Sequence, residues 1–228
     1  MSRKKQDIII VACVITIVLS ICAILCIHYS NKRNDFVFNE HLDKKVLKVY
    51  DDEYTEEITL QELGYYIINV EGDIDDMAHQ FNSDNLNAYW NVKLGKGLYT
   101  TRKYAKDLVI DKCVMDNIYY IEAIKSGVAL TEDEEELASE DARHILKNLT
   151  SRQMDVMDYS YEDLYNIMVK LYITSKYVNG LVEDGYTMEE IEIKGSYYEE
   201  IKKSYSYKVD DIWESVKLGN LTVKTKED

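Results

Sequence analysis

The chain has 228 residues and a formal net charge of −15, because 42 acidic side chains outnumber 27 basic ones. Beyond residue 28 the balance is near −17, which argues against binding to nucleic acid and against close contact of this part with anionic lipid headgroups. The chain contains no proline, which favours long uninterrupted helices over a loop-rich β domain.

The N-terminal region holds a run of 20 uncharged, mostly apolar residues at positions 8–27. A helix of this length spans about 30 Å, the thickness of the hydrocarbon core of a bilayer. We therefore predict a transmembrane helix over residues 8–28, after a cytoplasmic tail of residues 1–7. Three basic residues precede the run and two follow it, so the positive-inside rule places the main domain outside the cytoplasm.

A cleaved signal peptide is the alternative interpretation of this run. Signal peptides usually have an apolar region of about 7–15 residues that ends in a small-x-small cleavage site. The run here is longer and residues 26–29 lack such a site, which favours a retained anchor. Three of the four cysteines lie inside the run. Only Cys113 remains, so the polar part cannot form an intramolecular disulfide and must depend on its hydrophobic core.

The polar part is expected to be one all-α domain over residues 46–218, with five or six helices. Residues 29–45 are expected to form a juxtamembrane stalk and residues 219–228 a polar tail. The alternation in residues 46–50 indicates a short strand or an extended lead-in.

Helix starts follow along the chain, each marked by a serine or threonine three residues before an acid. The expected caps are Thr59, Thr131, Ser160 and Thr187. The helical pattern is expected to break at residues 82–87, and residues 94–97 indicate a turn. A long helix is predicted over residues 101–126 and ends at Gly127. A last helix, with Trp213, is predicted near residues 210–217.

The sequence contains no recognisable catalytic or metal-binding pattern, and we predict no catalytic residue, cofactor or metal. No two histidines are spaced as a zinc site on a helix requires. The acidic cluster from Glu71 to Asp76 lacks the spacing of a calcium loop and is interpreted as a solvated helix end. Cys113 lies on an apolar helix face without a partner base, so it is predicted to be a core residue.

Several segments resemble the helical N-terminal domain of SurA/PrsA-like exported chaperones. Residues 58–66 (ITLQELGYY) resemble the family's first helix start, and residues 127–134 (GVALTEDE) resemble its turn into the next helix. Ser160 to Leu164, followed by Lys176 and Tyr177, resembles a further helix. Residues 197–213 resemble the helix by which the C-terminal end returns to the same domain. The resemblance covers roughly residues 46–216 and rests mostly on capping and core positions.

The chain departs from this family at one position of consequence. Many members carry a parvulin peptidyl-prolyl isomerase module before the returning helix, but only residues 183–196 lie in that place. Residues 142–146 resemble the start of such a module, yet its Gly-Gly segment is missing and His144 falls within a helical pattern. Isomerase activity is therefore the weakest of three functional hypotheses.

The resemblance and the anchor together imply a membrane-anchored, extracytoplasmic, ATP-independent chaperone-like protein that binds unfolded or newly exported polypeptides. The alternative is a non-catalytic scaffold subunit of a cell-envelope complex. Flexible methionines and amphipathic tyrosines suit varied clients, although the same residues also suit an ordinary core. The candidate peptide-binding residues are Met115, Tyr119, Tyr120, Met154, Met157, Tyr165, Met168 and Tyr172.

Overall fold

The structure, a computed structural model, describes residues 36–223. The predicted tail and transmembrane helix of residues 1–28 lie outside this range. Among the described residues, no helix combines the length and the apolar character needed to cross a membrane.

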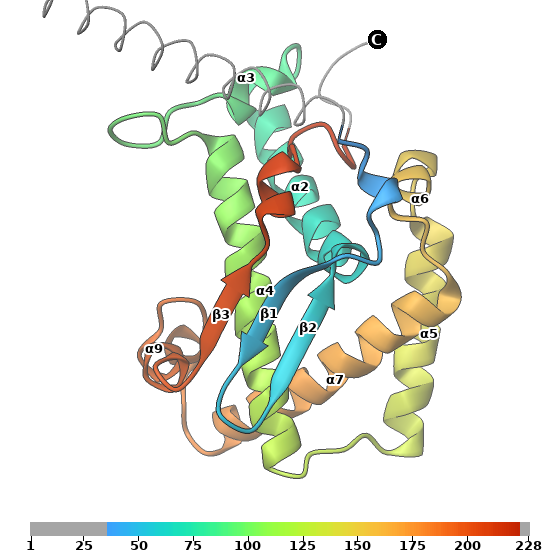
Figure 1. The fold of residues 1–228 in the computed structure, drawn as a ribbon, viewed down its shortest axis with the longest axis vertical. Helices are drawn as coiled ribbons and strands as arrows, with labels where there is room; N and C mark the ends of the chain where they lie inside the picture. The colour runs from blue at the N-terminus through green and yellow to red at the C-terminus, as the bar shows by residue number, and fades with distance from the viewer. Residues whose placement is uncertain (1–35, 224–228) are drawn as a thin grey trace, which may run out of the picture.

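The described chain is mostly helical and includes a small sheet (Figure 1). It begins with the 3₁₀ helix η1 (Phe38–Glu40), then strands β1 (Lys45–Tyr50) and β2 (Thr55–Thr59). The helices are α2 (Leu60–Asn82), α3 (Leu86–Trp90), α4 (Thr101–Lys125), α5 (Glu132–Asn148), α6 (Ser151–Met157), α7 (Tyr161–Glu183), α8 (Met188–Ile191) and α9 (Ser196–Lys202). Strand β3 (Ser206–Val209) and the 3₁₀ helix η2 (Asp211–Ser215) follow.

The three strands form an antiparallel sheet in the order β2-β1-β3. Leu47 in the central strand faces Ile58 on one side and Val209 on the other. Of the two interpretations of residues 46–50, the short strand is confirmed. The described chain is mostly helical, as expected, but β2 and β3 complete a small sheet that the all-α class did not include. The C-terminal part returns to the domain through β3, and not through one helix over residues 197–213.

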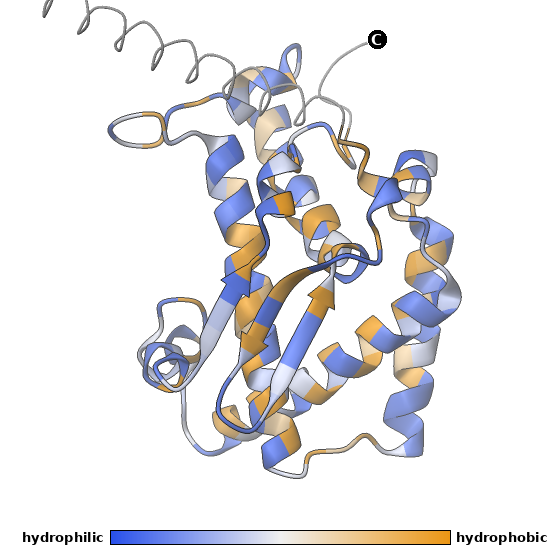
Figure 2. Ribbon diagram, in the orientation of Figure 1, coloured by the Kyte–Doolittle hydropathy of each residue, from blue (hydrophilic) through white to orange (hydrophobic). Residues whose placement is uncertain are grey.

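The core lies between the sheet and the helices behind it. Helix α4 packs against α2 and α7, and α7 also packs against α5 (Figure 1). Hydrophobic residues gather where these elements face one another, whereas the first turns of α5 are hydrophilic (Figure 2). Fully buried side chains from each layer fill this space, among them Val49, Ile58, Leu63, Ile67, Val109, Ile118 and Leu164.

Local capping signals set most helix ends as predicted. Thr131, Ser160 and Thr187 each form a reciprocal capping box, and Thr59 caps α2 by accepting from the backbone N–H of Glu62. Gly127 has a φ of 72°, and its N–H donates to the carbonyl of Ile124, as expected for the end of α4.

Three helix predictions need correction or addition. The last expected helix, at residues 210–217, is only the 3₁₀ helix η2. Helix α3 was not predicted. Helix α6 was also missed, although Thr150 opens it with a capping box. Helix α6 approaches α2 closely at Gly64, where an added Cβ would lie 2.4 Å from the sulfur of Met157.

The folded domain extends beyond residues 46–218 at both ends. Phe38 is buried within the region assigned to the stalk, and Thr222 is buried within the region assigned to the tail. Stalk and tail residues that the structure describes therefore belong to the packed domain.

Candidate functional site

A groove of about 650 Å³ lies between α4 and the C-terminal part of the chain. We call it the α4–β3 groove. Its apolar lining consists of Ile110, Tyr207, Val209, Trp213, Val216 and Leu218. Its charged lining consists of Arg102, Lys103, Lys106, Lys217, Asp107, Asp111 and Glu214. Pockets that combine apolar surface with a few polar groups are the usual sites for ligands.

One side of the groove is the edge strand β3. The N–H of Asp210 donates to the carbonyl of Val46 at 2.9 Å, and Lys208 faces Lys48. In an antiparallel ladder this register directs the backbone N–H and C=O groups of Tyr207 and Val209 away from β1. No other strand of residues 36–223 pairs with this outer edge. The edge is therefore available for main-chain hydrogen bonds.

Helix α4 forms the opposite side of the groove, and its residue Lys106 joins it to η2. The Lys106 ammonium donates to the carbonyl of Trp213 at 2.7 Å and lies 5.0 Å from the centre of its indole ring. The same ammonium lies 3.8 Å from the carboxylate of Glu214. Helix α4 and η2 are thereby fixed relative to each other, so the groove is largely preformed.

The wall formed by Val216 and Leu218 belongs to a segment that we call the C-terminal strap, residues 216–222. Glu71, which is completely buried on α2, anchors this strap. Its carboxylate accepts hydrogen bonds from the backbone N–H groups of Gly219, Leu221 (3.3 Å) and Thr222 (2.6 Å), and from the Thr222 hydroxyl (2.6 Å).

The structure therefore corrects the interpretation of Glu71 as part of a solvated helix end. Arg152 on α6 holds the same strap from another side, because its guanidinium donates to the carbonyls of Asn220 and Leu221. Nothing in the local sequence distinguishes Glu71 from its exposed neighbours Asp73 and Asp76 except its place on the buried face of α2.

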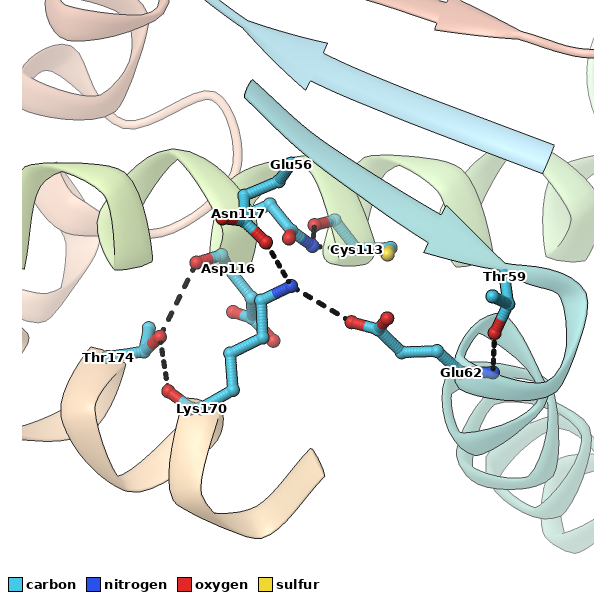
Figure 3. Close-up of polar contacts among 8 residues, drawn as sticks. All are labelled: Glu56, Thr59, Glu62, Cys113, Asp116, Asn117, Lys170 and Thr174. Atoms are coloured by element: carbon cyan, nitrogen blue, oxygen red, sulfur yellow. Dashed lines mark hydrogen bonds and ion pairs between the residues drawn. The ribbon is translucent and has the colours of Figure 1, made fainter. Parts of the chain in front are cut away.

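A second polar cluster surrounds Lys170 between β2, α2, α4 and α7 (Figure 3). The Lys170 ammonium lies 3.0 Å from the carboxylates of both Glu56 and Glu62, and 5.1 Å from the ring centre of Tyr120. The Thr174 hydroxyl donates to the carbonyl of Lys170 at 2.9 Å. Four elements meet at this one cation, which indicates a role in positioning the helices.

The electrostatics of this cluster do not produce an activated nucleophile. Burial alone would lower the pKa of Lys170. The carboxylates of Glu62 and Glu56 have the larger combined effect and raise this pKa. Burial raises the pKa of Cys113 well above its usual value. Its thiol is fully buried, as predicted for a core residue. A protonated thiol without access to solvent cannot attack a substrate.

Asp116 on α4 gives the cluster a predicted pH dependence. Burial raises its pKa to about 6 from 3.8, although Tyr66, Lys112 and Lys170 oppose the shift. Because the folded state holds this proton more tightly than the unfolded chain, the stabilisation is complete below about pH 4 and is lost as the pH rises through 6.

The free energy of unfolding of the wild-type protein should therefore fall by up to about 3 kcal/mol between pH 4 and pH 7 through this group. The Asp116→Asn variant, which cannot ionise at this position, should not show this fall. Urea unfolding of both proteins at pH 4.5, 6 and 7.5 measures this difference. Parallel pH profiles for the wild-type protein and the variant would contradict the assignment to Asp116.

The structure places six of the eight candidate peptide-binding residues in the hydrophobic core or against it. Tyr119, Met157 and Met168 are buried in the core, and the other five are half-buried. The Tyr119 hydroxyl donates to the carbonyl of Ile191 at 2.5 Å, and its ring contacts Tyr177, Tyr197 and Tyr198. The eight residues belong to α4, α6 and α7, and none lines the α4–β3 groove.

The sequence patterns did not predict the groove, since it depends on β3. Among residues 36–223, no group of three or more histidine, cysteine or acidic side chains is arranged to hold a metal ion. Searches against family models, curated proteins and solved structures give no significant match to this chain.

Proposed function

We propose that this chain is a membrane-anchored, extracytoplasmic, ATP-independent chaperone-like protein with a SurA N-terminal-like helical domain. Its clients would be unfolded or newly exported polypeptides. The observation that carries the proposal is the α4–β3 groove, which lies beside the unpaired edge of β3.

The groove and the edge together suit an extended polypeptide of varied sequence. A client segment would add to β3 as a further strand and pair with the outward backbone groups of Tyr207 and Val209. These main-chain hydrogen bonds do not depend on the client's sequence. Alternate client side chains would rest on apolar groove residues such as Ile110 and Trp213. Apolar burial would add about 25 cal/mol per Å², before the cost of ordering the client.

The proposal predicts that Tyr207→Pro greatly weakens the binding of clients. Proline removes the outward N–H at position 207 but leaves the hydrogen bonds between β1 and β3, since those use residues 206, 208 and 210. Tyr207→Ala is the matched control, because it shortens the side chain and keeps the N–H. The full-length wild-type protein, in nanodiscs and in several-fold molar excess, should suppress light scattering by an aggregating unfolded protein.

The proline variant should lose most of this suppression, while the alanine variant keeps more than half. Thermal unfolding of each variant checks that the fold is intact. A wild-type protein that does not slow aggregation would overturn the chaperone proposal. Recovery of one stoichiometric partner from cells, in place of many substoichiometric ones, would favour the alternative of a scaffold subunit.

A further inference from the structure

The segment of residues 85–106 differs in charge from the rest of this acidic chain. It contains no aspartate or glutamate across 22 positions. It carries five basic residues, Lys93, Lys96, Arg102, Lys103 and Lys106. The expectation that the acidic polar part avoids anionic lipid headgroups rests on its net charge and therefore does not apply to this cationic segment.

The centre of this segment is a hairpin of residues 93–100, which we call the basic hairpin. Lys93 bridges to Thr100, and the N–H of Leu94 donates to the carbonyl of Tyr99 at 2.9 Å. The hairpin projects from the body of the molecule just before α4 (Figure 1). Leu98 is 88% exposed, more than any other large hydrophobic residue of the described chain. In the sequence Leu98 lies between Lys93 and Lys96 on one side and Arg102 on the other. Such an exposed aliphatic side chain suits contact with an apolar environment outside the protein.

The last turns of α2 and helix α3 lie at the same end of the molecule as the basic hairpin (Figure 1). Met77 and Phe81, on the last turns of α2, are 51% and 59% exposed. Tyr89 on α3 contacts both residues: its ring lies 5.4 Å from that of Phe81, and its hydroxyl lies 3.6 Å from the sulfur of Met77. Exposed apolar residues beside basic ones are typical of protein surfaces that rest at a membrane interface.

The chain also enters the described fold near this end. Residues 38–40 pack against α6, Arg152 of α6 holds the C-terminal strap, and Gly219 of the strap packs against Trp90 of α3. The predicted anchor ends at residue 28, and an extended chain of seven residues spans at most about 25 Å. With the predicted anchor in the bilayer, the point where the chain enters the domain would lie within about 25 Å of the bilayer surface. The basic hairpin lies at the same end of the domain (Figure 1).

We infer that the basic hairpin docks the domain onto the anionic surface of the bilayer that holds the anchor. Leu98 enters the boundary between headgroups and acyl chains, and Lys93 and Lys96 lie against lipid phosphates. The inference rests on the proposed transmembrane anchor. The acidic first turn of α5, at the other end of the molecule, is repelled by the same surface and helps to orient the domain.

The test places a fluorescent probe at the hairpin of the full-length protein in lipid vesicles. Leu98→Trp is compared with Leu137→Trp, because Leu137 is also exposed (50%) but lies on α5. The native Trp90 and Trp213 are buried, and the unmodified protein measures their background. Vesicles contain phosphatidylglycerol with phosphatidylcholine, or phosphatidylcholine alone, each with brominated acyl chains as quencher.

In phosphatidylglycerol vesicles we expect several-fold stronger quenching at position 98 than at position 137, with emission shifted to shorter wavelength. Adding Lys93→Glu and Lys96→Glu should abolish most of this difference, as should phosphatidylcholine alone. Equal quenching at the two positions, in protein that co-floats with the vesicles, would overturn the docking inference and leave the anchor standing. Failure of the unmodified protein to co-float would overturn the anchor, and the docking inference with it.

Discussion

Glu71→Ala is expected to lower the free energy of unfolding by about 4 kcal/mol, because it leaves four donors of the C-terminal strap without their acceptor. The donors are three backbone N–H groups and a hydroxyl, and the carboxylate that accepts from them is completely buried. Alanine can neither accept these bonds nor fill the volume of the glutamate. The strap should therefore separate from α2, and the groove should lose the wall that Val216 and Leu218 provide.

Urea unfolding followed by tryptophan fluorescence measures this loss, since Trp90 and Trp213 both lie near the strap. Glu71→Gln should lose less stability, because its amide keeps one acceptor oxygen. Asp76→Ala is the matched control: Asp76 lies on the same helix and is exposed, so the change should stay within about 0.5 kcal/mol. Equal effects of the Glu71 and Asp76 variants would show that the strap does not depend on this carboxylate.

Lys170→Ala should have the second largest effect, a loss of about 3 kcal/mol in the free energy of unfolding. The substitution leaves the carboxylates of Glu56 and Glu62 close together without a cation. Lys170→Met should be milder, because it keeps most of the buried hydrocarbon volume. Double replacement of Glu56 and Glu62 by glutamine in the Lys170→Met background should recover part of the stability, since no uncompensated charge then remains.

Lys176 offers a control on the same helix. Its ammonium lies 2.6 Å from Glu134, but both side chains are about one-third exposed. Exposed ion pairs contribute little, so Lys176→Ala should lower the free energy of unfolding by less than about 1 kcal/mol. Similar losses for Lys170→Ala and Lys176→Ala would contradict a special role of the buried cluster in joining β2, α2, α4 and α7.

The local sequence predicted most helices because their signals act over a few residues. A side-chain oxygen of Thr131 or Ser160 bonds the N–H three residues on, and Gly127 adopts the left-handed conformation that ends α4. These interactions need no distant partner, so they can be recognised in the sequence. The burial of Cys113 was predictable for the same reason, since helical periodicity marks the face that packs inward.

The candidate site could not be predicted in this way. Residues 206–209 are mostly exposed and lack strand periodicity, and they form a strand only because β1 offers them an edge. The periodicity of α4 and α7 marked Tyr119 and Met168 as apolar-face residues, but it could not tell a core position from an open wall. That distinction depends on which distant elements cover each helix face.

The sequence by itself therefore determined the starts of most long helices, the mostly helical class and the net acidic charge, and it predicts the anchor at residues 8–28. The tertiary structure decided the sheet, the α4–β3 groove and the burial of Glu71. The physical reason is the range of the interactions. Caps, turns and periodicity act between residues three or four positions apart. The carboxylate of Glu71 meets Thr222 only after the chain has returned across 151 positions to the same core.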